Sequence, residues 1–178
     1  HADPWDPSEW ATPLGAMVAV TIEGRAVWIR PWLYVLTCPV GHSVPVLLLD
    51  TQLAQNAPGD RGITDRLYGG DSAWRLKQEI VLGIGGEMLL HALGFEIETY
   101  HLNEGHAALL TAALLRRHPR TTHLGTGDVL HYDDDRVREV CVFTTHTPIE
   151  AGHDHFPYDL VERQLAGVIP IGQLRLLA

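Results

Sequence analysis

The sequence predicts an α/β fold in which an antiparallel β segment precedes alternating helices and strands of a parallel sheet. Residues 17–32, "MVAVTIEGRAVWIRPW", alternate apolar and polar side chains around a Glu-Gly pair, which is typical of a β-hairpin. From residue 72 onward, amphipathic helical patterns alternate with short apolar, β-branched runs. That alternation is typical of a parallel sheet covered by helices.

The composition is that of one ordinary globular domain. Of the 178 residues, 46% are hydrophobic and 20% are charged, which is enough for a hydrophobic core. The net charge of −9 argues against a general nucleic-acid or anionic-membrane surface, because both attract Lys and Arg. No stretch approaches the ~20 apolar residues that span a bilayer. We therefore expect no nucleic acid and no membrane among its partners.

The first residues and the cysteines indicate a cytoplasmic protein. The start, "HADPWDPSEW", has neither the basic nor the apolar region of a signal peptide, and it lacks an initiator Met, which suggests a processed or trimmed chain. Cys38 and Cys141 are too few for a disulfide framework and stand among apolar residues, so we expect reduced core thiols. Of the thirteen basic residues, only Lys77 is a lysine.

Before residue 72 the patterns indicate strands and then a long loop. After the hairpin, residues 34–40 and 44–50 each form an apolar run that predicts a further strand. The polar stretch that follows carries Pro-Gly-Asp and Arg-Gly turn signals, and a loop of this length is more often functional than not. We therefore divide the single domain, residues 1–178, into four segments: an irregular N-terminal segment (1–16), a β-rich segment (17–50), a loop (51–71) and an α/β segment (72–178).

The α/β segment begins with a long predicted helix over residues 72–93. Its apolar residues recur at four-residue spacing, Ser72 is a natural N-cap, and Gly94 is a natural stop. Residues 95–101 then predict a short strand. The run "GIGG" falls inside the helical pattern, so it predicts close helix packing and not a dinucleotide-binding loop.

The remaining elements continue the alternation. We expect a helix over residues 103–118 with Asn103 as its N-cap, a strand over 138–146, and a final helix over 158–167. The run "DDDR" before the strand predicts a solvated turn. In parallel sheets, ligands gather at the carboxyl ends of the strands. Asn103 and His146 follow two such ends.

Several kinds of chemistry could explain the polar residues near these strand ends. The histidines most suggestive of metal are His101, His106, His153 and His155, but they match no tight zinc-binding pattern. We therefore expect no metal, although a His-rich metal-binding protein remains an alternative, and we assign no role to His153 or His155. No Gly-x-Ser-x-Gly elbow or activated cysteine indicates nucleophilic catalysis.

The polar residues also have simple structural explanations. Asn103 and Glu104 can stabilise a helix start, and Arg75 with Glu79 can form an i,i+4 pair on a solvated helix face. What these explanations omit is the convergence of polar groups on one sheet edge beside the Gly-rich run "RLYGGD". Neutral side chains and backbone groups of this kind suit a polyhydroxyl ligand.

Three motifs, in order over about residues 46–156, resemble α-glucan (glycogen, starch or maltodextrin) phosphorylases of the short bacterial and archaeal type. They are "LLLDTQLAQNAPGDRGITDRLYGGDSAWRLKQEIVLGIGGEMLLHALG", "YHLNEGHAALL" and "VFTTHTPIEAGHDHF". The resemblance implies part of the N-terminal domain of a two-domain GT-B glycosyltransferase. The full-length enzyme would release glucose 1-phosphate from α-1,4-glucans by phosphorolysis, with pyridoxal phosphate as cofactor.

The resemblance also implies which residues border the glucan cleft. The gate-like run "RLYGGD" would place four of them at the mouth of the active site: Tyr68, Gly69, Gly70 and Asp71. "HLNEGH" would place Asn103, Glu104 and His106 on the wall of the cleft. His146 would contact the 6-hydroxyl of the glucosyl unit through its backbone carbonyl.

Parts of the family pattern are not found in this sequence. The cofactor lysine belongs to the C-terminal domain, whereas Lys77 lies in "RLKQE" of the N-terminal domain and is not expected to be that lysine. The chain thus resembles an interior part of the N-terminal domain, and alone we expect it to bind no pyridoxal phosphate and to lack activity. Its expected partners are α-1,4-glucan, phosphate, the C-terminal domain and, through the family, a second copy in a homodimer. A non-catalytic carbohydrate-binding or regulatory domain is the alternative.

Overall fold

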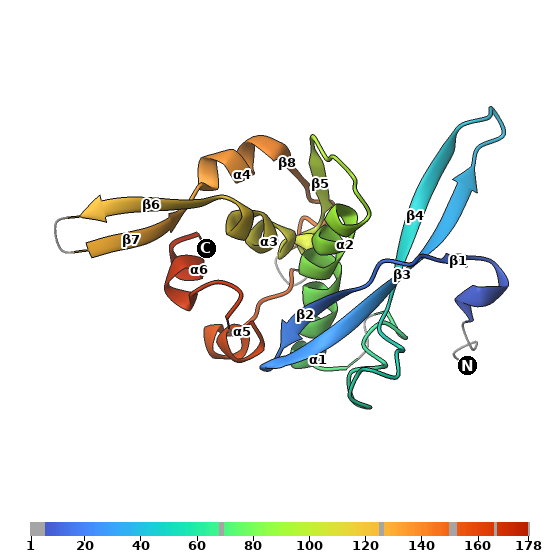
Figure 1. The fold of residues 1–178 in the computed structure, drawn as a ribbon, viewed down its shortest axis with the longest axis horizontal. Helices are drawn as coiled ribbons and strands as arrows, with labels where there is room; N and C mark the ends of the chain where they lie inside the picture. The colour runs from blue at the N-terminus through green and yellow to red at the C-terminus, as the bar shows by residue number, and fades with distance from the viewer. Residues whose placement is uncertain (1–5, 68–69, 125–126, 150–152, 166, 178) are drawn as a thin grey trace.

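The computed structural model of the chain describes residues 6–67, 70–124, 127–149, 153–165 and 167–177. It is a mixed α/β structure in which a helical rod, residues 72–92, lies between two β arms (Figure 1). The first β arm comprises strands within residues 12–50, and the second comprises residues 119–124 and 127–132 on the opposite side. None of the helices in these ranges is long and apolar enough to cross a membrane.

The first β arm contains the predicted hairpin. Strands β2 (Val18–Ile22) and β3 (Arg25–Thr37) pair antiparallel, as the alternating pattern predicts. Glu23 and Gly24 between them both have positive φ, 51° and 76°, which is the backbone of a tight type I′ turn and favours Gly. Strand β4 (Ser43–Asp50) pairs antiparallel with the other edge of β3.

Two expectations for this arm were wrong. β3 does not end near Trp32 to make room for a separate strand at 34–40; it continues unbroken to Thr37. The following residues form the turn to β4, closed by the Cys38 N–H, which donates to the His42 carbonyl at 2.7 Å. Cys38 is therefore exposed at a turn and is not a core thiol, whereas Cys141 is half-buried. The residues at 34–37 belong to the outer part of one long strand, and this part faces solvent.

The segment before this hairpin has short regular elements. A 3-10 helix, Pro7–Glu9, follows an Asp6 side chain that accepts from the Ser8 N–H at 2.9 Å. A two-residue strand, β1 (Thr12–Pro13), then pairs with β3.

The helical rod consists of α1 (Ser72–Glu79), a π-helix (Ile80–Gly85) and α2 (Gly86–Ala92), matching the predicted helix closely. Its N-cap is Asp71 and not Ser72, because the Asp71 carboxylate accepts from the Trp74 N–H at 2.9 Å. Its end is as expected, since Gly94 adopts φ 80°. The rod packs against β2 and α3 (Leu110–Arg117), around fully or almost fully buried side chains that include Ile22, Ile29, Ile80 and Leu89.

Glycines in the π-helix permit the closest of these contacts. A Cβ on Gly83 would lie 2.6 Å from the backbone nitrogen of Leu110, at the start of α3. A Cβ on Gly85 would overlap the Ile29 side chain on β3. The "GIGG" run thus serves close packing, as the sequence predicts.

Beyond the rod, strand β5 (Tyr100–Asn103) pairs in parallel with β8 (Cys141–Thr144), and Asn103 lies opposite Thr144. The predicted strand at 95–101 is displaced toward the C-terminus. Asn103 ends β5 and does not cap a helix. It is followed by Glu104, a 3-10 helix (Gly105–Ala107) and only then α3.

The region between α3 and β8 also differs from expectation. A second antiparallel arm, β6 (Pro119–Leu124) with β7 (Gly127–Tyr132), was not predicted. The "DDDR" run is not a solvated turn: the Asp133 carboxylate accepts from the Arg136 N–H at 3.0 Å and caps α4 (Asp134–Val140). This helix shortens the strand expected at 138–146. Helices α5 (Tyr158–Gln164) and α6 (Ile171–Leu177) complete the described chain.

Candidate functional site

The parallel pairing of β5 and β8 brings two polar residues from distant parts of the sequence together. Asn103 is the last residue of β5, and His146 follows β8 by two residues. The His146 Nε2 lies 2.9 Å from the Asn103 side-chain oxygen. Because an amide oxygen only accepts, His146 donates from Nε2, and its neutral form keeps Nδ1 as an acceptor.

Glu104 holds the segment after β8 in place. Its Oε1 accepts from the backbone N–H of His146 and from that of Thr147, the latter at 3.1 Å. Its Oε2 accepts from the Thr145 hydroxyl at 3.1 Å. These bonds, that of the His146 N–H above all, lower the pKa of Glu104, so this carboxylate is ionised at neutral pH. Glu104 is therefore engaged by the protein backbone, and its own backbone has a positive φ of 60°.

A second cluster lies around Arg75 on α1. The Arg75 guanidinium contacts the Asp154 carboxylate at 3.0 Å and the Nδ1 of His106 at 2.9 Å. It also lies 3.5 Å from Glu79, one turn along the same helix. Burial, together with the nearby Asp154 carboxylate, raises the pKa of Glu79 to about 8, so Glu79 is mostly protonated at neutral pH.

Glu79, His106 and Asp154 offer ligand atoms within 4.8 Å of one another, which is close enough to suggest a metal. The positive charge beside them is nevertheless that of Arg75, which contacts all three. A divalent ion would have to displace this guanidinium and the proton on Glu79. Elsewhere in the described chain, His153 contacts only a backbone carbonyl, that of Thr147 at 3.1 Å. The cluster is best described as an internal ion network.

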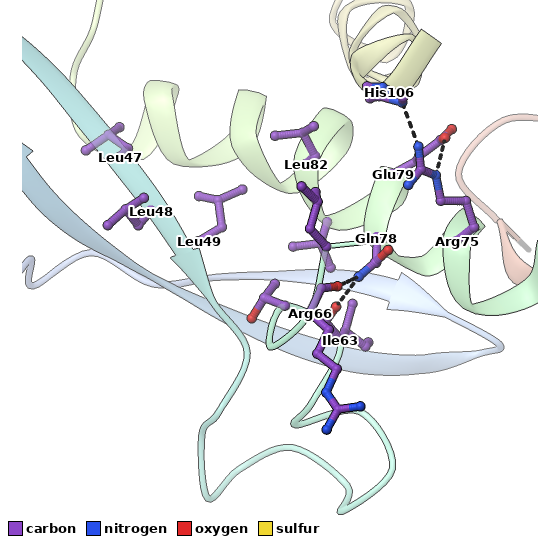
Figure 2. A pocket seen from close by; sticks show the side chains of 13 residues that line it. Leu47, Leu48, Leu49, Ile63, Arg66, Arg75, Gln78, Glu79, Leu82 and His106 are labelled. Carbon is purple, nitrogen blue, oxygen red and sulfur yellow. Dashed lines mark hydrogen bonds and ion pairs between the residues drawn. The ribbon is translucent and has the colours of Figure 1, made fainter. Parts of the chain in front are cut away.

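This network closes one end of a pocket of about 390 Å³ between β4 and the helical rod (Figure 2). Figure 2 shows the Arg75, Glu79 and His106 side chains at that end and leucines of β4 toward the other. Most of the pocket wall is aliphatic, contributed chiefly by Leu47, Leu48, Leu49, Ile63, Leu67, Val81 and Leu82. The lining includes neither Asn103 nor His146, so the pocket and the Asn103–His146 pair are distinct features. An aliphatic wall also does not suit a polyhydroxyl ligand.

Comparison with known proteins shows what the sequence of the chain is similar to. A maltodextrin phosphorylase from Thermococcus litoralis is 42% identical over 150 residues, which cover 84% of this chain and 17% of that protein. A glycogen phosphorylase from Mycobacterium tuberculosis is 42% identical over 168 residues, 90% of this chain and 18% of that protein. The chain is similar in sequence to the α-glucan phosphorylases. A glycogen phosphorylase from Aquifex aeolicus is 30% identical over 83% of this chain.

The similarity confirms the resemblance drawn from the three motifs. The chain spans less than a fifth of the length of the first two relatives. No family model and no solved structure matches it.

The phosphorylase-like residues named from the sequence fall into three places. Asn103, Glu104 and His146 lie together at the ends of β5 and β8, whereas His106 belongs to the Arg75 network. Gly70 and Asp71 lie at the start of α1, where Gly70 has a φ of 79°. Within the described ranges, no hydrogen bond or ion pair joins this pair to the β5–β8 cluster. Tyr68 and Gly69 lie outside the described residues.

Sequence reasoning missed the Arg75 network. The Arg75–Glu79 spacing was recognised but read as a solvated helix face. The Arg75 side chain is in fact only 15% exposed and that of Glu79 only 7%. Their partner Asp154 comes from 79 residues away, and only tertiary structure reveals that contact.

Proposed function

We propose that this chain forms part of the glucan-facing wall of an α-1,4-glucan phosphorylase. The observation that carries the proposal is the convergence of Asn103 and His146 at the carboxyl ends of β5 and β8, in a chain similar to these enzymes. Amide and imidazole side chains at such an edge can hydrogen-bond sugar hydroxyls. Glu104 would act by holding the His146 backbone in place.

In the full-length enzyme, the chain would serve phosphorolysis of the terminal glucosyl unit. The bond between the anomeric carbon and the glycosidic oxygen breaks, and a phosphate oxygen bonds to that carbon. The proton that phosphate gives up balances the one that the leaving oxygen takes up. The products are glucose 1-phosphate and a glucan shorter by one unit. The role proposed for this chain is to orient the glucosyl unit, while charge is stabilised by groups of the other domain.

The residues of this chain do not fit pyridoxal phosphate. A Schiff base requires a lysine amine, and Lys77 is the only lysine. Its Nζ lies 3.0 Å from the Glu23 carboxylate and holds α1 against the β2–β3 turn. We therefore propose that the cofactor lysine belongs to the rest of the enzyme.

We also propose binding partners and a cellular location for the chain. The partners would be α-1,4-glucan, phosphate and the C-terminal domain of the same enzyme, with a second copy if the enzyme is a homodimer. Its location would be the cytoplasm, where storage glucans and phosphate meet.

Titration calorimetry with maltoheptaose tests the binding role. We expect saturable binding of maltoheptaose and none of cellohexaose, a β-1,4-linked control of similar size, because the site would be shaped for the α linkage. The chain alone should release no glucose 1-phosphate from maltoheptaose and phosphate and should retain no cofactor absorbance after gel filtration. Equal binding of both sugars, or none of either, would contradict the proposed role.

A further inference from the structure

The Arg75 network joins the two segments that carry the proposed glucan residues. His106 follows Glu104 by two residues, in the 3-10 helix after β5, and Asp154 lies in the segment that continues from His146. Arg75 stands on a third element, the α1 helix, and contacts both at 2.9–3.0 Å. The segments after β5 and β8 are thus connected through the Arg75 side chain, in addition to the direct contacts that Asn103 and Glu104 make with the segment after β8.

The Arg75 side chain is itself held in place by the surrounding structure. The stem of Arg75 is covered, since 15% of the side chain is exposed, and α1 is part of the rod that forms the core. Hydrogen bonds between charged groups in a partly buried place are stronger than exposed ion pairs. Asp154 and His106 are each more exposed than Arg75, so the ordered arginine fixes the more exposed partners.

We propose that Arg75 is a positioning residue that sets the spacing of the segments after β5 and β8 and thereby the affinity of the chain for α-1,4-glucan. The inference rests on the proposed function and goes beyond it, because Arg75 need not touch the sugar. It acts through His106 on the Asn103–Glu104 side and through Asp154 on the His146 side.

Glu79 makes this positioning dependent on pH. The groups that face it are Arg75 on its own helix, Asp154 from the segment after β8, and His106 beyond Arg75. While Glu79 is protonated and uncharged, Asp154 is the carboxylate that pairs with the Arg75 guanidinium. Once Glu79 ionises, which the raised pKa places near pH 8, two carboxylates compete for one cation and repel each other. The Asp154 contact should therefore loosen above pH 8.

The test compares Arg75→Met, which keeps the apolar stem, with Arg75→Lys and with the control Arg163→Met. Arg163 lies on α5 and forms an i,i+4 pair with Asp159 in which both side chains are largely exposed, 64% and 70%. We expect maltoheptaose affinity to fall about tenfold in Arg75→Met, to recover in part in Arg75→Lys, and to be unchanged in Arg163→Met. Wild-type affinity should fall above pH 8, and that of Glu79→Gln should not.

A second readout needs no sugar. In Arg75→Met the backbone amide NMR signals of residues 104–106 and 144–147 should both shift, and in Arg163→Met neither set should. Unchanged affinity and unchanged signals in Arg75→Met would overturn the inference. If the wild type binds no glucan while both sets shift, the proposed function fails but the coupling of the segments stands. Should Arg75→Met unfold, Asp154→Asn provides the same comparison from the exposed end of the network.

Discussion

Glu79 is the residue whose environment departs furthest from its ordinary chemistry. Its carboxyl is almost fully buried beside Asp154, its Oε1 lies 3.5 Å from the Arg75 guanidinium, and its pKa rises to about 8 from an ordinary 4.5. A carboxyl whose pKa is higher in the folded state binds more protons there than in the unfolded state. Its contribution to stability is therefore fully present below pH 4.5 and is lost as pH rises toward 8.

A Glu79→Gln variant tests this at the residue scale. Urea unfolding of wild type and variant from pH 5 to pH 9 should show the wild type losing free energy of unfolding relative to the variant, by roughly 2 to 4 kcal/mol. The loss should level off above pH 8. Parallel curves for the two proteins, with no widening between pH 5 and pH 8, would mean that Glu79 ionises normally in the folded chain.

At the scale of elements, the helical rod depends on small residues where it meets α3 and β3. Gly83 faces backbone atoms of Leu109 and Leu110, which cannot move aside as a flexible side chain could. Gly86, in the same "GIGG" run, has only ordinary contact space, with the nearest atom of Leu49 at 3.9 Å. Alanine substitutions at Gly83 and Gly86 should therefore have opposite effects on stability, and each serves as the control for the other.

Gly83→Ala should destabilise the chain by about 1 to 3 kcal/mol, because the added methyl forces α3 away from the rod. Gly86→Ala should be neutral or stabilising by up to about 1 kcal/mol, because alanine is the better helix former. Thermal unfolding of both variants beside the wild type measures the difference. Equal stability of the two variants would show that the rod and α3 are not packed as closely as described.

Elements with strong local signals were predicted well, and those set by distant partners were not. The Glu23–Gly24 turn and the rod ending at Gly94 follow from local backbone preferences. Asn103 has the chemistry of a helix N-cap, yet its side chain pairs with His146, 43 residues away. Asp133 caps a helix where sequence alone suggested a turn. A polar side chain near the end of a helix or strand can either cap a helix or bond to a distant residue, and tertiary structure decides between these two roles.

At the scale of the whole molecule, strand β8 of the β5–β8 pair is exposed on both faces, although Leu102 of β5 is buried. Val142 and Phe143 are neighbours on β8, so they point to opposite faces, and they are 51% and 57% exposed. Parallel strands are usually covered on both faces. The residues predicted to face glucan, Asn103, Glu104 and His146, lie at the ends of this same pair of strands, and the sequence could name them as candidates because the motif resemblance covers each of them. The Arg75 network could not be found in that way, because it depends on a fold that links α1 with two later segments.

The central claim is that the ends of β5 and β8 form a glucan-facing wall. The most direct measurement is an amide NMR titration of the chain with maltoheptaose. We predict saturable shifts at residues 103–106 and 144–147, with smaller shifts at Gly70 and Asp71, and no shifts at the distant β6–β7 arm. A well-dispersed spectrum that maltoheptaose leaves unchanged at residues 103–106 and 144–147 would contradict the claim.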